Sequence, residues 1–361
     1  MKNVTRVGIC TSGGDCQGLN TAIRAVGKAL YEHIENVEIY GMYDGYRGLI
    51  DCDYKFMQPA DFSGIINLGG TILGTSRQRF IPGKDIVDEN GDSLIPAMKD
   101  TYNRINLDCL VVMGGNGTQK SAKLLADAGM NIVTLPKTID NDIFGTDITF
   151  GFQSAVDIAT NVIDCIHTTA TSHGRIFVVE CMGRDAGWLT LSAGIGSGAD
   201  AILLPEIPYD VNSLTDLITS RRKKGRGFTI IACAEGAVEK GDRLLTEEEA
   251  RAKKEAEKYS TVSYKLAADL ERITGQDARV VVPGHYQRGG PPCPYDRVLA
   301  TRFGAAAADL IINKQYGRMV AMQNGSITSI PIEESASKTK FLPVDHPLIK
   351  VARDVGICLG D

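Results

Sequence analysis

The amino-acid sequence predicts an α/β protein with more than one domain. Short apolar runs alternate along the chain with longer amphipathic segments, which is the pattern of stacked β-α-β units rather than of an all-α or all-β protein. The length of 361 residues suggests about two domains, each large enough for its own core. Two of the apolar runs also lead directly into glycine pairs. These observations predict parallel sheets covered by helices.

The apolar runs are interpreted as buried strands because they are short and are bounded by turn-forming residues. After a first strand that begins near Arg6, the candidates in chain order are residues 37–40, 109–113, 132–135, 176–181, 201–204, 228–232 and 279–282. Helical spacing of apolar residues predicts helices over 18–32 and 153–166.

Glycine pairs follow the first strand and the strand at 109–113. The first turn contains Gly13 and Gly14, and the second runs from Gly114 to Thr118. Without side chains, such turns let backbone N–H groups approach phosphate oxygens, and the following helix adds its positive N-terminus. Neither turn fits a standard nucleotide fingerprint, because Gln119 and Lys120 stand where further glycines would be needed. An ordinary glycine turn would explain either one alone.

The segment 136–142 places two carboxylates, a hydroxyl and a cation directly after the apolar run 132–135. This grouping suits phosphoryl transfer, because one carboxylate can take a proton from an attacking hydroxyl while the other helps to hold Mg²⁺. The lysine can face phosphate charge. A solvated turn is the alternative interpretation for this segment alone. Together with the two glycine turns, the segment favours a phosphate site.

Composition excludes several other classes of protein. The 39 basic and 44 acidic residues give a formal charge of −5 and a pI near 5.7, which argues against a general nucleic-acid binder. The nine cysteines lack metal-type spacing and include Cys10, Cys181 and Cys233 in strand candidates, so we expect reduced, buried thiols. No apolar run approaches 18 residues and no signal peptide is recognisable. We therefore expect a soluble, cytoplasmic protein that does not bind a membrane.

Seven ordered motifs between about residues 6 and 312 resemble those of the bacterial-type 6-phosphofructokinase family. They are Gly13-Gly14-Asp15 with Gly18-Leu19-Asn20, the run 69–77 ending in Arg77, the turn 114–118, the segment 137–142, Met182-Gly183-Arg184, Glu235, and the run 284–290 followed by 294–297. The tail beyond Gln323 carries no family signature.

The resemblance implies two doubly wound three-layer domains with the active cleft between them. The chain would cross between the domains near residue 150 and again near Arg288. A phosphoryl-donor-binding domain would comprise residues 1–150 and about 288–335. A sugar-phosphate-binding domain would comprise residues 151–287 and about 336–361.

The resemblance also implies roles at the reacting groups. Asp140 corresponds to the general base that takes the proton from the sugar's 1-hydroxyl, and Thr138 would orient that hydroxyl. Asp142 would lie on the metal side of the transferring phosphate. Arg77 and Arg184 would neutralise charge that spreads over the phosphate oxygens, because a guanidinium fork suits them better than a point charge.

On the sugar side, the family's pattern assigns His285 and Arg288 to the 6-phosphate and Glu235 to the sugar hydroxyls. Met182 and Gly183 would complete the floor of the sugar-phosphate site. Arg175 and Arg279 would reach the 6-phosphate of the neighbouring subunit, which implies a homodimer or a homotetramer.

On the donor side, the residues that match nucleotide-binding positions are Gly14, Tyr46, Arg77, Gln78, Gly115, Asn116, Gly117, Thr118 and Lys137. Tyr46 would lie near the adenine, although a core tyrosine is the alternative there. Asn116 stands where most relatives have an aspartate, and with Asp142 it would hold Mg²⁺ less strongly. Lys137 stands where many ATP-using relatives have glycine and is common in pyrophosphate-using ones. His167 replaces an arginine that is usual at the effector site, so control by an effector does not follow.

The expected function is Mg²⁺-dependent transfer of the γ-phosphoryl group of ATP to fructose 6-phosphate. The alternative is a pyrophosphate-dependent enzyme that acts on fructose 6-phosphate or sedoheptulose 7-phosphate. A non-catalytic phosphosugar-binding relative is a third hypothesis, suggested only by Asn116. The presence of Thr138, Asp140, Asp142 and Arg184 argues against it.

Overall fold

The computed structural model describes residues 4–77, 79–81, 85–242 and 259–361, and it divides the chain into two compact units. Unit 1 consists of Met1–Ser154 and Arg288–Lys340, and unit 2 consists of Ala155–Gln287 and Phe341–Asp361. The chain therefore passes between the units after Ser154, after Gln287 and after Lys340. The sequence predicts these crossings near residue 150, near Arg288 and near residue 335.

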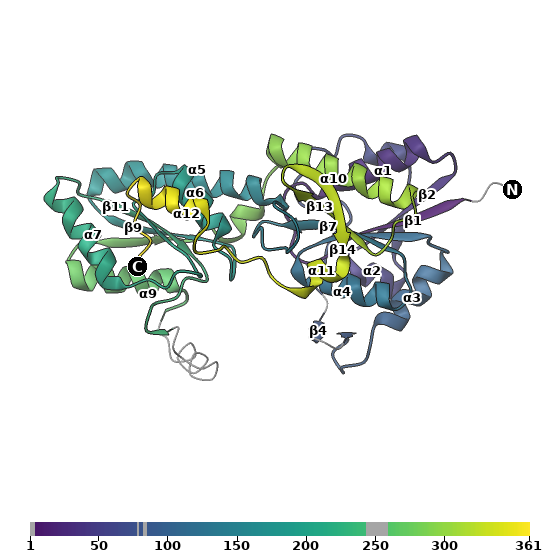
Figure 1. The fold of residues 1–361 in the computed structure, drawn as a ribbon, viewed down its shortest axis with the longest axis horizontal. Helices are drawn as coiled ribbons and strands as arrows, with labels where there is room; N and C mark the ends of the chain where they lie inside the picture. The colour runs from purple at the N-terminus through teal and green to yellow at the C-terminus, as the bar shows by residue number, and fades with distance from the viewer. Residues whose placement is uncertain (1–3, 78, 82–84, 243–258) are drawn as a thin grey trace. The chain divides into compact units, whose positions relative to one another are not determined.

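Unit 1 is built on an eight-stranded sheet (Figure 1). Its strand order is β14-β13-β7-β6-β1-β2-β3, with β8 paired to β7. The strands β13, β7, β6, β1 and β2 are parallel, and β3 and β14 close the two edges in antiparallel pairs. The bounds are β1 Thr5–Thr11, β2 Val37–Met42, β3 Tyr54–Met57, β6 Cys109–Gly114, β7 Ile132–Thr138, β8 Phe150–Gly151, β13 Arg318–Gln323 and β14 Ser326–Pro331. A small hairpin, β4 Arg79–Ile81 and β5 Asp85–Val87, stands apart from this sheet.

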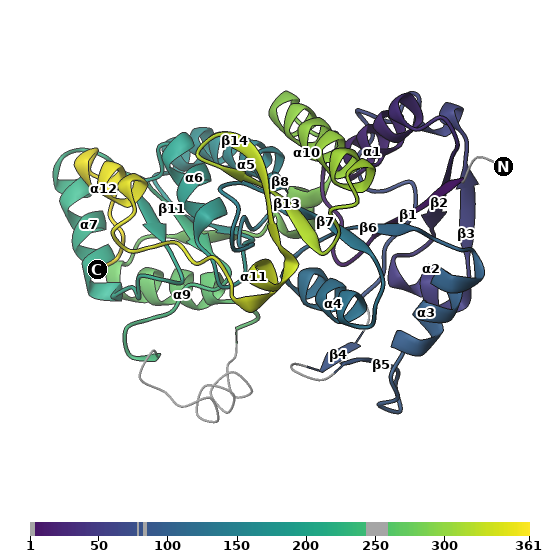
Figure 2. The same ribbon diagram turned by 45° about the vertical axis from the view of Figure 1, so that its right-hand side comes forward.

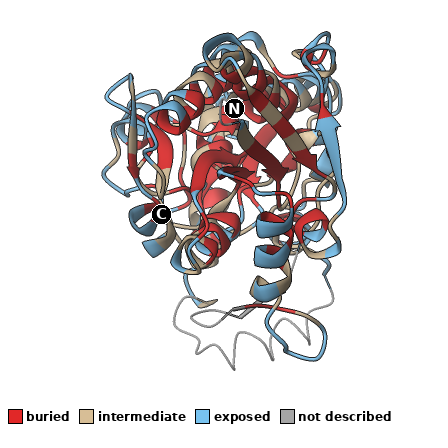
Figure 3. Ribbon diagram, turned by 90° about the vertical axis from the view of Figure 1, so that its right-hand side faces the viewer, coloured by how far each residue is buried: buried red, intermediate tan, exposed pale blue. Residues whose placement is uncertain are grey.

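Helices cover both faces of the unit 1 sheet. On one face α1 and α10 lie side by side, and on the other the core cluster joins α2, α3, α4 and α11 to the strands (Figures 1 and 2). Their bounds are α1 Leu19–His33, α2 Tyr46–Asp51, η1 Pro59–Phe62, α3 Ile95–Arg104, α4 Asn116–Asp127, α10 Pro294–Ile312 and α11 Ile332–Ser337. The central strand β6 is buried along its whole length, which explains its unbroken apolar sequence. Figure 3 shows buried residues, in red, concentrated on strands in the interior of the fold.

Unit 2 has a four-stranded parallel sheet in the order β10-β11-β9-β12. One core cluster packs α5, α6 and α12 on one face, and another packs α7 and α9 on the opposite face. The bounds are α5 Phe152–His173, β9 Ile176–Cys181, α6 Trp188–Gly196, β10 Ala201–Leu203, α7 Val211–Lys223, β11 Thr229–Ala234, α9 Val262–Thr274, β12 Ala278–Val281, η3 Gly284–Arg288 and α12 Pro347–Asp354. Both units are thus doubly wound and three-layered, as predicted.

The strands extend beyond the predicted ranges at two points that matter for function. Strand β7 continues through Lys137 and Thr138, because these residues pair with Phe150 and Gly151 of β8. Strand β11 ends at Ala234, so Glu235 is the first residue after it. The polar residues of the segment 136–142 therefore begin inside a buried strand rather than in the loop that follows it.

The tail beyond Gln323, for which the sequence predicts no role, completes both units. Strand β14 pairs with β13 in unit 1, and α12 adds Ile349 and Ala352 to the core of unit 2. No helix among the described residues is long and apolar enough to cross a membrane. The expected burial of Cys10, Cys181 and Cys233 is confirmed.

Candidate active site

Three adjacent strands of unit 1 deliver polar loops to one edge of its sheet. The parallel strands β7, β6 and β1 are neighbours, and their carboxyl ends lie in register, with Thr11 beside Met113 and Gly114 beside Pro136. The two glycine turns and the loop after Thr138 therefore start at the same edge. Open α/β sheets bind ligands at this edge.

The first glycine turn is held by backbone and hydroxyl contacts. The Ser12 N–H donates to Met113 O at 3.0 Å, and the Gly13 N–H donates to Ser76 O at 3.1 Å. The Thr75 hydroxyl donates to Gly13 O at 2.7 Å. Gly13 has a φ of 82°, a left-handed conformation that favours glycine. The segment that ends in Arg77 thus fixes the turn.

Three cations surround Gly14. The buried ammonium of Lys137 donates to Gly14 O, and the guanidinium of Arg288 lies where a Cβ on Gly14 would be. That Cβ would also be 3.4 Å from Nη2 of Arg77. Burial and the nearby Arg288 charge lower the pKa of Lys137, while Asp140 and Asp15 oppose this shift. The buried Arg288 Nε has no hydrogen-bond partner among the described residues, so the turn suits an oxyanion.

The second glycine turn leads directly into α4. The helix begins at Asn116, so Gly117 and Thr118 lie in its first turn, where N–H groups lack partners within the helix. A Cβ at Gly114 would overlap the Thr118 side chain, which explains that glycine. A Cβ at Gly117 would meet nothing within 4 Å. Gly117 therefore faces open space.

The loop after β7 carries Asp140 and Asp142. The Asp140 N–H donates to the Thr138 hydroxyl at 3.1 Å, which fixes the two predicted residues relative to each other. The Asn116 amide nitrogen donates to Asp142 Oδ2 at 2.6 Å and to Asp142 O at 3.1 Å. This pair links the start of α4 to the loop.

The predicted metal residues, Asn116 and Asp142, are thus adjacent. Oδ1 of Asn116 is buried and has no hydrogen-bond partner among the described residues. No cluster of three or more His, Cys, Asp or Glu side chains that could hold a metal occurs in the described part of the chain. Two protein oxygens fit Mg²⁺, which usually keeps several waters and binds through one or two carboxylates and substrate phosphates.

Unit 2 gathers a second group of predicted residues at the carboxyl edge of its own sheet. Met182, Gly183 and Arg184 follow β9, and Glu235 follows the neighbouring β11. The Arg184 N–H donates to Glu235 Oε1 at 2.9 Å. Arg184 has a φ of 52°, and both its side chain and that of Glu235 are exposed.

The side chain of Gln287 connects this group to Gly284, at the start of the turn that carries His285, and the sequence gives it no predicted role. Its Oε1 accepts from the Met182 N–H at 3.2 Å, and its amide donates to Gly284 O at 3.2 Å. Gln287 is fully buried, whereas His285 is exposed. The motif 284–290 showed where Gln287 lies, but its contact with Met182 depends on the tertiary fold.

Arg175 and Arg279 lie at the opposite side of the unit 2 sheet, where its strands β9 and β12 begin. Arg175 precedes β9, and Arg279 is the second residue of the parallel neighbour β12. At about 3.3 Å per residue, β9 separates Arg175 from Met182 by roughly 20 Å. The predicted sugar-phosphate residues of unit 2 therefore form two separate groups within one chain.

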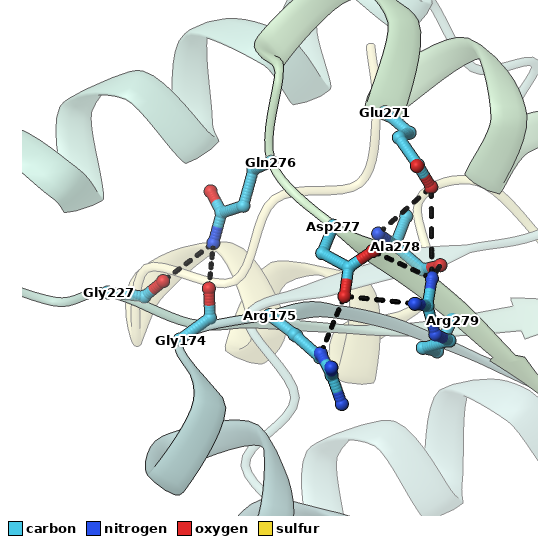
Figure 4. Close-up of polar contacts among 8 residues, drawn as sticks. All are labelled: Gly174, Arg175, Gly227, Glu271, Gln276, Asp277, Ala278 and Arg279. Carbon is cyan, nitrogen blue, oxygen red and sulfur yellow. Dashed lines mark hydrogen bonds and ion pairs between the residues drawn. The ribbon is translucent and has the colours of Figure 1, made fainter.

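Asp277 holds both arginines (Figure 4). Its Oδ2 accepts from Arg175 Nε at 2.7 Å and from Arg279 Nη2 at 3.0 Å, and its Oδ1 is 2.8 Å from Arg279 Nη1. The neighbouring Gln276 amide donates to Gly174 O and Gly227 O at 2.7 and 2.6 Å. The side chain of Arg175 is 31% exposed and that of Arg279 is 49% exposed, so both arginines carry positive charge at the surface.

Two predicted donor residues remain, Tyr46 and Gln78. Tyr46 is 2% exposed and belongs to the core of unit 1, which favours the alternative of a core tyrosine over contact with the adenine. Its hydroxyl donates to Thr118 O at 3.3 Å, so Tyr46 supports the second glycine turn from within the core. Gln78 lies outside the described residues.

The chain resembles phosphofructokinases along most of its length. The sequence model of the family described as phosphofructokinase matches residues 6–311. A Spirochaeta thermophila protein named ATP-dependent 6-phosphofructokinase is 51% identical over 98% of this chain and 97% of that protein. A Propionibacterium freudenreichii protein of the same name is 46% identical over 99% of each.

Solved structures show the same fold. Phosphofructokinase from Pichia pastoris in the T-state superposes with a TM-score of 0.78 at 33% identity, over 93% of this chain. This chain spans only 36% of the length of that one. A pyrophosphate-dependent phosphofructokinase from Marinobacter aquaeolei gives a TM-score of 0.80 at 18% identity, covering 99% of this chain and 88% of the other. That likeness concerns the fold alone.

Proposed function

This chain belongs to the phosphofructokinase family, and from that premise we propose how its residues carry out the ATP-dependent phosphorylation of fructose 6-phosphate. The reaction moves the γ-phosphoryl group of ATP to the 1-hydroxyl of the sugar and yields fructose 1,6-bisphosphate and ADP. The observation that carries the residue assignments is the meeting of two glycine turns and the Asp140 loop at one sheet edge. Three cations lie at that edge.

Asp140 acts as the general base. Its carboxylate takes the proton of the 1-hydroxyl, so that the oxygen can attack the terminal phosphorus as the bond to the leaving phosphate breaks. The Asp140 N–H bond to Thr138 supports this role, because it holds the carboxylate beside a hydroxyl that orients the sugar oxygen.

Cations neutralise the charge of the transferring group. Arg77 and Lys137 at the Gly14 turn bind donor phosphate oxygens, and Arg184 serves the transferred phosphoryl group from unit 2. Arg288 has its guanidinium at the same turn, which favours contact with the transferring phosphates in addition to its predicted contact with the 6-phosphate. Gly115, Gly117 and Thr118 supply the N-terminal amides of α4.

Mg²⁺ would be held by Asn116 and Asp142, and when bound it would neutralise charge on the donor phosphates. The buried Oδ1 of Asn116, which has no hydrogen-bond partner in the described part of the chain, supports this assignment. One charged ligand rather than two predicts moderate affinity, with phosphate oxygens and waters completing the shell.

The sugar phosphate is bound mainly by unit 2. Glu235 accepts hydrogen bonds from the sugar hydroxyls, Met182 and Gly183 form the floor, and His285 binds the 6-phosphate. Arg175 and Arg279 bind the 6-phosphate of a neighbouring subunit. The length of β9 supports this division, because a single phosphate cannot meet both sheet edges of one chain.

The first prediction tests the base. Asp140→Asn removes the proton acceptor but keeps the shape of the side chain, so we expect kcat to fall by about 10² to 10⁴-fold. Binding of fructose 6-phosphate, measured by titration calorimetry, should change little. Asp100→Asn, a change at an exposed carboxylate on α3, is the control. Near-normal turnover in the Asp140 variant would remove Asp140 from the mechanism.

One residue favours a second function, in which pyrophosphate is the phosphoryl donor. That residue is Lys137, which is common in pyrophosphate-using relatives. Gly117 favours ATP as the donor, because it leaves open a space beside α4. An aspartate at this position would fill that space with bulk and negative charge. A cation such as Lys137 stabilises ATP and pyrophosphate alike, whereas a side chain that blocks a space excludes only one of them. The residue at position 117 therefore discriminates between the donors more strongly than Lys137 does.

The second prediction therefore concerns Gly117. Gly117→Asp should depress kcat/KM for ATP much more than binding of fructose 6-phosphate. Gly117→Asn, of equal size but neutral, should fall between the wild type and the aspartate variant. Turnover by the wild type with pyrophosphate and none with ATP would overturn the assignment of the donor.

A further inference from the structure

A short stretch of the tail lies along the loop that carries Asp140 and Asp142. Thr339 forms an antiparallel bridge with Ile143, and the Lys340 N–H donates to Asp142 O at 2.7 Å. The ammonium of Lys338 is 4.0 Å from the centre of the Phe144 ring. The stretch 338–340, at the very end of unit 1, is therefore docked on the loop by backbone pairing, of which the Lys340 N–H bond is part, and by a cation–π contact.

The side chain of Lys340 adds three further contacts with the same loop. Its ammonium donates to Asn141 Oδ1 at 3.1 Å, to Thr146 O at 2.9 Å and to Asp147 O at 3.0 Å. An ammonium has three N–H donors, and here each meets an oxygen of the same loop. Two of these oxygens are backbone carbonyls, so the contact fixes the path of the loop itself.

Asn141 explains how this contact reaches the reacting groups. It stands between the two carboxylates and has a φ of 52°, a left-handed conformation that asparagine adopts more readily than most residues. Its Oδ1 accepts from the Thr149 N–H at 3.1 Å as well as from Lys340. Lys340 thus holds the residue whose backbone sets the directions of Asp140 and Asp142.

We propose that Lys340 is a positioning residue for phosphoryl transfer, which clamps the loop 139–149 so that Asp140 and Asp142 keep their working geometry. The proposal rests on the proposed function of these two carboxylates. Lys340 itself belongs to none of the substrate-binding groups described above. Its removal should therefore slow the transfer step rather than weaken the binding of the sugar.

The test is steady-state kinetics of Lys340→Met, which keeps the length of the side chain and removes its donors. Because misplacing a reacting group by about 1 Å costs on the order of 10²-fold, we expect kcat to fall by about 10 to 100-fold, with KM for fructose 6-phosphate within about threefold of the wild type. Lys340→Arg keeps the charge and several N–H donors, and its kcat should lie above that of Lys340→Met. Lys350→Met is the matched control, since Lys350 is an exposed lysine of α12 paired with Asp354.

Hydrogen exchange of the full-length chain supplies a readout that does not depend on activity. Peptides covering 139–149 should exchange faster in Lys340→Met than in the wild type, while peptides of β11 should not change. A kcat within threefold of the wild type in the folded variant would overturn the proposal. So would a loss confined to KM, or unchanged exchange in the loop.

Two further comparisons separate this proposal from its premise. If Asp140→Asn retains activity, the proposed base is wrong, whereas full kcat in Lys340→Met together with an inactive Asp140→Asn refutes only the clamp. Should Lys340→Met fail to fold, Lys340→Gln takes its place, because it keeps a donor in the same space but is too short to reach all three oxygens. The same kcat, KM and exchange criteria then apply.

Discussion

At the scale of single residues, Asn116 shows why an amide and a carboxylate are not equivalent at this site. Its nitrogen donates to Asp142 Oδ2 at 2.6 Å, and its own Oδ1 is left buried and unpaired among the described residues. An aspartate has no N–H to donate, so the same position would bring two negative charges together. Asn116 therefore lets Asp142 keep its place without a cation.

This leads to a prediction for Asn116→Asp. The added carboxylate should lower the Mg²⁺ concentration at half-maximal rate, because a charged oxygen holds a hard cation more firmly than an amide does. Without Mg²⁺ the same variant should melt at a lower temperature than the wild type, and Mg²⁺ should restore it. The opposite change, Asp142→Asn, should raise the Mg²⁺ requirement. An unchanged or higher requirement in Asn116→Asp would show that residue 116 faces away from the metal.

The sequence could predict residues whose neighbours are local, and it missed those that depend on distant segments. Gly14, Thr138 and Asp142 reach one edge because strand ends carry them there, which apolar runs and glycine pairs reveal. For Tyr46 the sequence left a core tyrosine and a neighbour of the adenine as alternatives, because core and surface tyrosines look alike in sequence. Gln287 and Lys340 act through contacts with residues far along the chain, for which no local pattern exists.

At the scale of elements, the packing of α1 against α10 positions the first glycine turn. Helix α1 begins just after that turn, and α10 begins just after Arg288. The Gln17 amide donates to Gly289 O at 2.8 Å, which joins the two approaches. The helices come close because Gly304 lacks a side chain, and a Cβ there would lie 2.6 Å from the Ala25 Cβ and 2.8 Å from Ala22 O.

Gly304→Ala should therefore destabilise unit 1, although alanine is the better helix former. The gain in helix propensity is about 1 kcal/mol, whereas overpacking against backbone costs about 1 to 3 kcal/mol. We expect a lower melting temperature and, because the displaced α10 carries Arg288 with it, a lower kcat. Gly117→Ala is the matched control, since its Cβ meets open space at the start of α4 and should not lower the melting temperature. Equal stability of the two variants would contradict this account of the helix contact.

At the scale of the whole molecule, the predicted sugar-phosphate residues of unit 2 lie in two groups, one where the strands end and one where they begin. This separation predicts sites that are shared between subunits. A chain with Asp140→Asn keeps Arg175, and a chain with Arg175→Ala keeps Asp140. Mixing the two inactive proteins under conditions of subunit exchange should restore activity, because some sites then combine both intact residues. Mixing either variant with itself is the control. No recovery, despite exchange demonstrated by mass spectrometry, would count against the shared site.

The sequence also predicted the fold class of the two units, through the alternation of apolar runs and the family's motifs. The elements of the tail were not predicted, because β14 is held by pairing with β13 and α12 by packing into the core of unit 2, and no local pattern reveals either contact. The expected cleft between the two units stays a prediction.

The position of β13, far after β7 in the chain, has a consequence for folding during synthesis. Strand β13 pairs with β7, with Arg318 beside Val133, so the sheet of unit 1 cannot be completed until the ribosome has added the residues of β13. At roughly 5 to 20 residues per second, the edge of β7 waits on the order of 10 to 40 s for its partner. An unpaired strand edge favours pairing with a wrong strand until its partner has been made. The sheet that carries the Asp140 loop is therefore completed long after the loop itself has been synthesised.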